Sequence, residues 1–506
     1  MELQQATSPP PQSQGPVVSR RTALKYGSAV AAAAATLNLL DAVAWRPLRP
    51  VVAEAATLPD IQFDIGAFIA PAQMINGVQF QFGPVYTTFA TAALSRLPTK
   101  TEQATLANAL NTIESAYPFS PSGAFVFVSY GLPYFRRLPA ALVSANIPRL
   151  ATNTSRSVLE EAVPSPTDVH PSNPGVTKRK FNVTVRIESN DLLFTVRSDN
   201  PGNISDILNW LAGSNRLAGR AVTSPSLPLS FTSARVMFLQ PGMPRLVASN
   251  NHLPFIDVVN DQSPMWMGFA DQQTSGSGPP QIVTFQGNGS ARLTTATPGS
   301  YFDNGSIQHL SHVILDLEAF YARAGEAGSD EDETYLERVQ YMFRSNPPPS
   351  LGNPGSPFSN GGGPSFLPND FRGAGDALAN ASGNGTLNGE HRIGHLSALQ
   401  RSSRAADGTP IHLRMDGPGF DSMDVPPGVP IPWGSRNVPK LQFTVFVPTA
   451  DFFATMRRNQ ASLDLQNQFG VDLTDNGLER FLTATRRQNF LIPPRRHRAF
   501  PLLELT

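Results

Sequence analysis

The chain has 506 residues, of which 40% are hydrophobic and 15% are charged, and its formal net charge is zero. This length is sufficient for two or more domains with hydrophobic cores, and the balanced charge provides no basic field that would attract nucleic acid. The chain contains no cysteine. Disulfides, thiolate nucleophiles, iron–sulfur clusters and cysteine-bound zinc are therefore excluded, and a bound metal would need His, Asp or Glu ligands.

Residues 1–56 are typical of a disordered start followed by an export leader. The first residues are rich in Pro, Gln and Ser, and the sequence SRRTALK at 19–25 matches the twin-arginine export pattern. Small-residue cleavage sites fit at 42–44 and 53–55. We expect the twin-arginine translocation machinery to deliver the protein to the periplasm, the cell surface or the extracellular space. The alternative is an arginine pair that merely precedes an anchor helix.

The apolar run behind the arginine pair is short, rich in alanine and interrupted by Asp41. A membrane-spanning helix needs about 20 strongly apolar residues. We therefore expect no stable membrane insertion after processing.

Hydrophobic periodicity predicts alternating strands and helices in the first part of the chain. Strands are expected where apolar residues are continuous or alternate, and helices where they recur every three or four positions. The expected strands lie at 78–82, 124–130, 191–199 and 234–239, and the expected helices at 85–97, 101–116 and 203–212.

The second part of the chain repeats this alternation around a long insertion. Residues 346–390 are rich in Pro, Gly and Asn and too poor in apolar residues to form a core. The expected strands are 305–315, 441–447 and one that ends at 490–494, and the expected helices are 316–324 and 449–460.

The predicted elements form a coarse internal repeat, which favours an α+β fold built twice. Strand–turn–helix units recur around 78–97, 191–212, 305–324 and 441–460. We expect two ferredoxin-like domains, at 57–270 and 271–506, each with an antiparallel sheet and helices packed on one face. No Gly-x-Gly-x-x-Gly motif follows a strand, and the chain has neither a Walker loop nor a Gly-x-Ser-x-Gly elbow.

The histidines provide few metal-binding patterns. His391 and His395 are four residues apart and would share one face of a helix, but Arg392 stands where a zinc-protease motif requires Glu. His309 and His312 lie where a predicted strand meets a predicted helix, and we interpret them as ordinary surface or core histidines.

Three residues at the edges of strand-rich segments could act together on a buried ligand: Asp271, His395 and Arg414. A haem site needs one neutral imidazole on the iron and polar groups in an apolar cavity on the other side. For peroxide chemistry, a carboxylate can move a proton while an arginine stabilises negative charge. Spacing alone leaves the other interpretation open, in which Asp271 is a surface residue that opens a turn.

The order of several motifs resembles the dye-decolourising peroxidase family of haem enzymes. The similarity extends from about residue 58 to the C-terminus. Its best points are DLLFTVRSDNP, MGFADQQ, GSIQHLSHVILDLEAF, GHLSALQ followed by IHLRMDGPGF, KLQFTVFVPTADFF and FLIPP. The family motif Gly-x-x-Asp-Gly is matched from Gly268 to Asp271, with Gln272 in place of the final glycine.

The resemblance implies two ferredoxin-like domains of the dimeric α+β barrel type, one haem b per chain and a function as an exported peroxidase. In that case His395 is the iron ligand, Asp271 the distal acid–base residue and Arg414 the distal arginine. The substrates would be hydrogen peroxide and phenolic or dye-like aromatic reductants, and a homo-oligomer is compatible with the family.

The chain also departs from the family pattern. Gln272 adds a side chain beside Asp271, and Glu479 is only a weak candidate for the acid that bonds the proximal imidazole. Two alternatives therefore stand beside the peroxidase: a haem-binding protein with weak activity, and a haem-free exported protein that keeps the fold. His391 remains the alternative iron ligand.

Overall fold

The computed structural model describes residues 28–41, 58–75, 78–164, 168, 180–268, 280–287, 293–322, 335, 338, 402, 411–461, 463–464 and 477–506. Within these residues, no helix is long and apolar enough to cross a membrane.

The N-terminal half of the molecule is a four-stranded antiparallel sheet with two connecting helices. Its elements in chain order are β3 (Tyr86–Leu94), α3 (Lys100–Ala116), β4 (Phe125–Gly131), β6 (Leu192–Ser198), α6 (Pro201–Leu211) and β9 (Leu229–Phe238). In space the strands lie in the order β4-β6-β3-β9. Numbered along the chain, the four strands lie side by side in the order second, third, first and fourth. This is the ferredoxin-like arrangement.

The C-terminal half repeats this arrangement. Its elements are β10 (Ser306–Leu315), α8 (Leu317–Tyr321), β11 (Leu413–Arg414), β12 (Gly417–Asp421), β13 (Val438–Val447), α12 (Ala450–Ala461) and β14 (Leu482–Ile492). Both β11 and β12 pair with β13, and the order continues through β10 to β14. The predicted α+β fold with two ferredoxin-like halves is therefore confirmed.

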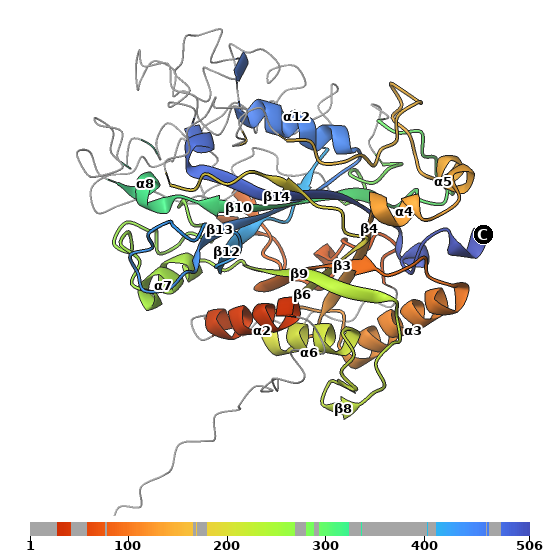
Figure 1. Ribbon diagram of the computed structural model, residues 1–506, viewed down its shortest axis with the longest axis horizontal. Coiled ribbons are helices and arrows are strands. Elements are labelled where there is room, and N and C mark those ends of the chain that lie inside the picture. Colours follow the sequence, from red (N-terminus) through yellow and green to blue (C-terminus); the bar gives the residue numbers. More distant parts are fainter. Residues whose placement is uncertain are drawn as a thin grey trace, which may run out of the picture.

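Figure 1 shows how the main elements are arranged, and the remaining elements complete the described chain. They are α2 (Ser28–Asp41), η1 (Gly66–Phe68), β1 (Gln73–Ile75), β2 (Val78–Phe80), α4 (Leu132–Arg136), α5 (Ala140–Asn146), β5 (Arg186–Ile187), β7 (Arg216–Leu217), β8 (Arg220–Ala221), α7 (Met243–Asn250), η3 (Gly477–Phe481), η4 (Arg495–His497) and η5 (Leu503–Leu505).

The two halves are joined into one sheet of ten strands, and the sheet curls until its edges meet. The junction is the β14–β4 pair, where Phe490 lies opposite Gly131. At the two far edges of the sheet, β12 lies against β9. A Cβ on Gly417 would lie 3.0 Å from the Phe238 carbonyl oxygen, and one on Gly419 would lie 3.0 Å from that of Val236. A Cβ at either position would be a tight contact, which glycine avoids because it has no side chain.

The curled sheet encloses an interior that is filled by side chains from both halves. Phe89, Phe127, Leu310, Phe446 and Phe490 come from five different strands and belong to one buried cluster. Side chains alternate between the two faces of a strand. Every second side chain therefore points outward, where the helices pack.

One buried hydrogen-bond network crosses the interior. Gln308 accepts from the Ser129 hydroxyl at 2.5 Å and donates from Nε2 to Thr195 Oγ1 at 3.0 Å. Gln308 belongs to the C-terminal half and its two partners to the N-terminal half. These bonds fix the register between the halves, since an unsatisfied buried amide would cost free energy.

The prediction of a helix at 85–97 was wrong, because this segment contains strand β3. Apolar residues at Val85, Phe89, Ala92 and Leu97 have helical spacing, but eight of the nine strand residues are buried, on both faces. A strand that is buried on both sides loses the alternation by which strands are recognised.

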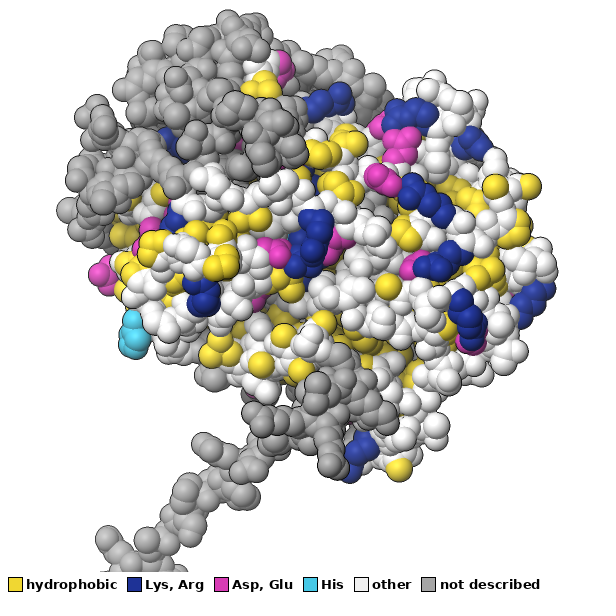
Figure 2. All heavy atoms as spheres, viewed as in Figure 1, with side chains coloured by type: hydrophobic (Ala, Val, Ile, Leu, Met, Phe, Trp, Pro, Cys, Tyr) yellow, Lys and Arg dark blue, Asp and Glu magenta, His cyan; other side chains and the backbone are white. Residues whose placement is uncertain are grey.

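The outer surface carries mixed charge. On the face shown in Figure 2, the described basic side chains lie among acidic ones and apolar atoms. Arg156, for example, contacts both Glu160 and Asp451, and Arg136 contacts Glu161 at 2.8 Å. This pattern agrees with a formal net charge of zero.

We predict that Gly417→Ala destabilises the protein, because the added methyl group would press on the Phe238 carbonyl where the sheet edges meet. Overpacking of this kind costs about 1–3 kcal/mol. The matched control is Gly428→Ala, where the added Cβ has no atom within 4 Å. Denaturant unfolding measures both. Equal stability of the two variants would contradict the closure of the sheet by β12 and β9.

Candidate functional site

Of the three predicted site residues, the structure describes Arg414 alone. Asp271 and His395 lie outside the described residues, as do Gln272 and His391. Arg414 is the second residue of β11, where it is partly buried.

Arg414 lies in a row of four side chains that crosses the C-terminal sheet. Val445 of β13 is opposite Arg414 on one side and His309 of β10 on the other, and His309 is opposite Asn489 of β14. Residues that are directly opposite in an antiparallel sheet point to the same face. The row therefore lies on one face, and α12 covers it, because Phe453 of that helix stacks on His309.

His309 is fully buried and held on all sides. Its Nδ1 lies 2.7 Å from Asn489 Oδ1, its Nε2 lies 2.6 Å from Ser311 Oγ, and its ring centroid is 3.2 Å from that of Phe453. Burial lowers the pKa of His309 well below its ordinary value, and the charges of Arg487 and Arg457 lower it further, while the bond to Asn489 acts in the opposite direction. The imidazole is thus neutral, and both of its nitrogens are engaged.

A buried ion network lies next to this row. Ser311 is opposite Arg487, whose guanidinium binds the Asp168 carboxylate through both terminal nitrogens. Arg457 donates to Glu479 at 2.9 Å and lies 3.7 Å from Asp168. Burial lowers the pKa of Arg487 to about 10, and the neighbouring Arg457 contributes. Glu479, the weak candidate for the proximal acid, is thus paired with a guanidinium.

The sequence patterns alone did not identify His309 or Arg487 as members of a candidate site. The sequence left open whether His309 lies in the core or on the surface, and the structure buries it. A usable signal was present in the alternation of SIQHLSHVIL, which places His309 and Ser311 on one face. The partner Asn489 comes from β14, 180 positions later, and its proximity depends on the fold.

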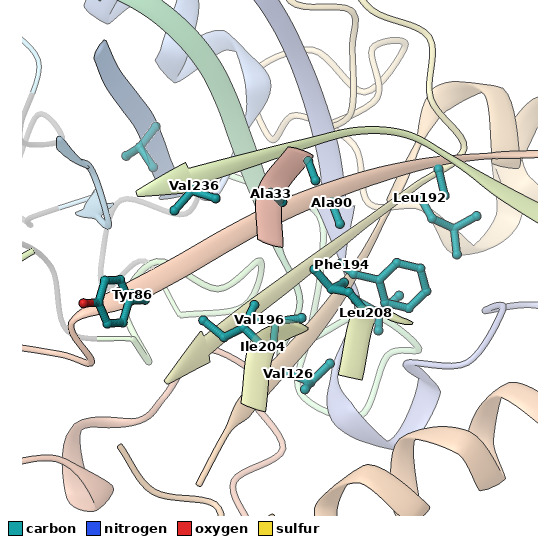
Figure 3. Close-up of a cluster of buried hydrophobic side chains, with 14 of the residues drawn as sticks. Ala33, Tyr86, Ala90, Val126, Leu192, Phe194, Val196, Ile204, Leu208 and Val236 are labelled. Carbon is teal, nitrogen blue, oxygen red and sulfur yellow. The ribbon is translucent and has the colours of Figure 1, made fainter. Parts of the chain in front are cut away.

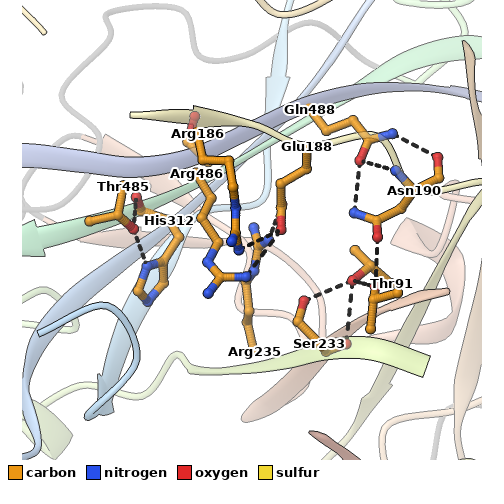
Figure 4. A network of polar contacts seen from close by, with 12 residues as sticks. Thr91, Arg186, Glu188, Asn190, Ser233, Arg235, His312, Thr485, Arg486 and Gln488 are labelled. Carbon is orange, nitrogen blue, oxygen red and sulfur yellow. Dashed lines mark hydrogen bonds and ion pairs between the residues drawn. The ribbon is translucent and has the colours of Figure 1, made fainter. Parts of the chain in front are cut away.

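A second group, the interior polar cluster, lies on the opposite face of the same strands (Figure 4). It is an ion network within the enclosed space. Its members are Glu188, Arg235, His312, Asp421, Asp424, Lys440, Thr485 and Arg486.

The charges of the interior polar cluster are paired. Arg486 forms two bonds of 2.6 Å with the Asp424 carboxylate and also contacts Glu188, which binds Arg235. Such bidentate pairs are strong and directional. Burial raises the pKa of Asp424, but Arg486 and His312 outweigh this and hold that pKa below its ordinary value. The cluster therefore contains opposite charges in a fixed geometry.

Lys440 and His312 complete the cluster. Lys440 is fully buried, donates to the Met423 carbonyl at 2.7 Å and lies 3.7 Å from Asp421. Burial lowers the pKa of Lys440 to about 8, although Asp421 and Asp424 oppose the shift. His312 binds Thr485 through Nδ1 at 2.7 Å. Among the described residues, no group of three or more His, Asp or Glu is arranged to hold a metal ion.

The comparisons with known proteins place the chain in a family. The model described as "Family of unknown function (DUF7405)" matches residues 84–494, and the chain belongs to this family. No curated protein matches the chain.

Solved structures with similarity to the chain include several dye-decolourising peroxidases. A variant of Rhodococcus jostii RHA1 DypB in complex with heme is 12% identical over 82% of this chain and 95% of that one, with a TM-score of 0.43. The encapsulated DyP-type peroxidase of Mycobacterium smegmatis is 13% identical over 83% and 96%, with a TM-score of 0.41. The enzyme of Bacteroides thetaiotaomicron VPI-5482 is 13% identical over 82% and 94%, with a TM-score of 0.39.

We predict that Asp421→Asn destabilises the protein above pH 4 by roughly 1–3 kcal/mol, because it removes the charge that faces Lys440. Burial raises the pKa of Asp421, but Lys440 and His312 lower it to about 2, against an ordinary 3.8. A depressed carboxyl pKa contributes stability that is complete above the ordinary value and lost as the pH falls through the folded one.

The difference in unfolding free energy between wild type and Asp421→Asn should therefore shrink between pH 4 and pH 2. The exposed Asp257, changed to Asn, is the control and should show little difference at any pH. A difference that stays constant down to pH 2 would contradict the pairing.

Proposed function

We propose that this chain is an exported haem-binding protein with peroxidase activity, and that the haem lies on the outer face of the C-terminal half. One observation supports this most strongly. Arg414, the described residue of the proposed site, lies on the sheet face under α12, in the same row as the neutral His309. When bound, haem iron supplies the activation of peroxide and the oxidation of aromatic reductants.

Three described histidines of the C-terminal half are engaged in polar contacts or packing. His309 uses both ring nitrogens, and His312 points to the interior polar cluster. His412 is buried and stacks on Phe452. The proposal assigns the ligand to His395, and His391 is the alternative. In the part of the donor set that the structure describes, Arg414 fits the role of the distal cation.

Arg414 and Asp271 would act on the peroxide side. A guanidinium remains charged at any physiological pH and can donate to negative charge as it develops. In a water-poor site such a preorganised donor stabilises charge more strongly than water does. The Asp271 carboxylate would take the proton from one peroxide oxygen and deliver it to the other. His309 would be a poor acceptor for that proton, because its pKa is lowered and both of its ring nitrogens are engaged.

A second candidate function is favoured by the packing of the same face. The close stack of His309 on Phe453 shows that α12 already fills part of the outer face. Gln272 also replaces the motif glycine beside Asp271. A haem-free exported protein that keeps this fold is consistent with both observations. A protein that binds haem but has weak peroxidase activity lies between these two candidate functions.

The ligand assignment is tested by absorption spectra of protein produced with added haem. We expect His395→Ala to abolish the Soret band and His391→Ala to leave it largely intact, because one imidazole binds the iron. The opposite result moves the ligand to His391. Unchanged spectra in both variants contradict the haem assignment.

The role of Arg414 is tested by stopped-flow mixing of the haem-loaded protein with peroxide. Arg414→Leu should retain the Soret band and slow the reaction on the order of 10²–10³-fold, as expected for the loss of one charge-stabilising donor. The control is Arg436→Leu, since Arg436 is bonded to loop carbonyls of 425 and 426. A fast wild-type reaction that Arg414→Leu does not slow contradicts the assigned role.

A further inference from the structure

The helix α2 has the side-chain distribution of a docked core helix. Val30, Ala33, Leu37 and Leu40 recur at intervals of three or four residues, and each is at most 2% exposed. The adjacent Leu39 is 41% exposed. Two neighbouring leucines thus have opposite environments, which indicates that one face of the helix packs against the protein.

The docked face of α2 lies in a groove of the N-terminal half. Val236 and Phe238 point from β9 to the outer face of the sheet, and Leu208 belongs to α6. All are at most 2% exposed and belong to the same cluster as the buried face of α2. In Figure 3, Ala33 lies beside Ala90 and near Val236. The helix therefore packs on β9, β3 and α6 together.

The surface that α2 covers is apolar. The helix α6 packs on β6 and β3, while α2 packs on β9 at the edge of the same half. Removal of α2 would expose the outer side chains of β9, and contiguous apolar surface of that kind promotes association. The N-terminal half thus depends on α2 to complete its outer layer.

Asp41 gives the docked helix a polar contact. The hydroxyl of Tyr86, a fully buried residue of β3, donates to Asp41 Oδ1 at 3.3 Å. A carboxylate in the apolar run of a leader is unfavourable inside a membrane. Against the folded protein, the same carboxylate receives a hydrogen bond at the end of the helix.

From these contacts, we propose that α2 is a permanent element of the folded protein, which retains residues 28–41 as the cover of the groove between β9 and α6. The arginine pair at 20–21 precedes this helix. The N-terminal segment would therefore hold first an export signal and then a structural helix. Cleavage at 42–44 or 53–55 would remove the cover and expose β9. The proposal does not depend on haem binding.

The docking is tested by hydrogen exchange of the α2 amides in the full chain. Leu40→Asp places a charge in the groove, and the exchange rate of these amides should rise roughly tenfold or more, because local opening becomes easier. Leu39→Asp is the matched control on the exposed side and should leave protection unchanged. Equal protection in the two variants overturns the proposal.

Tyr86→Phe provides a milder variant that should fold, since it deletes only the hydroxyl that binds Asp41. It should raise exchange at the C-terminal end of α2 by a few-fold, because one hydrogen bond is lost. Unchanged exchange at the C-terminal end of α2 would contradict a stabilising role for the hydrogen bond between Tyr86 and Asp41.

Retention is tested by the intact mass of the protein after export. We expect the mature chain to include residues 28–41. A mature chain that begins after residue 41 overturns the proposal.

Discussion

The closure of one antiparallel sheet on itself is the constraint on which the rest of the structure depends. The two ends of the strand order are β9 and the side of β13 that carries β12. They approach so closely that a Cβ at 417 or 419 would lie 3.0 Å from a carbonyl oxygen of β9. This contact covers part of each edge, although no hydrogen-bonded pair joins β9 to β12 or β13 in the described residues. Closure also buries both faces of the strands, because one face lines the interior and the other is covered by helices.

Burial on both faces explains the distribution of polar residues. Any charged side chain on the inner face is cut off from water and must find a partner of opposite charge. Arg235 and Arg486 both contact Glu188 in this way, although the three residues come from β9, β14 and the segment before β6. Replacement of a single partner would leave a buried charge, so the interior polar cluster holds the two halves in one register.

Much of the fold was predictable because most strands carry strong local signals. The strands at 192–198, 306–315 and 438–447 and the helix at 100–116 fall close to their expected positions. The strand β3, 86–94, was misread as a helix because buried residues fill both of its faces. Closure of the sheet, which explains that pattern, is a long-range property and leaves no local signal.

The candidate site was predictable to a smaller extent. Arg414 was singled out by its motif, and the structure shows it on the sheet face that α12 covers. The environment of that face could not be read from the chain, because His309 meets Asn489 and Phe453 only after the sheet and α12 assemble. The roles of Asp271 and His395 remain predictions.

The haem site on the outer face of the C-terminal half is the central claim, and a haem titration of the full-length protein tests it most directly. Added haem should produce a Soret band that saturates at one equivalent per chain. Absorption without saturation, or no Soret band, would contradict the claim and favour a haem-free protein with the same fold.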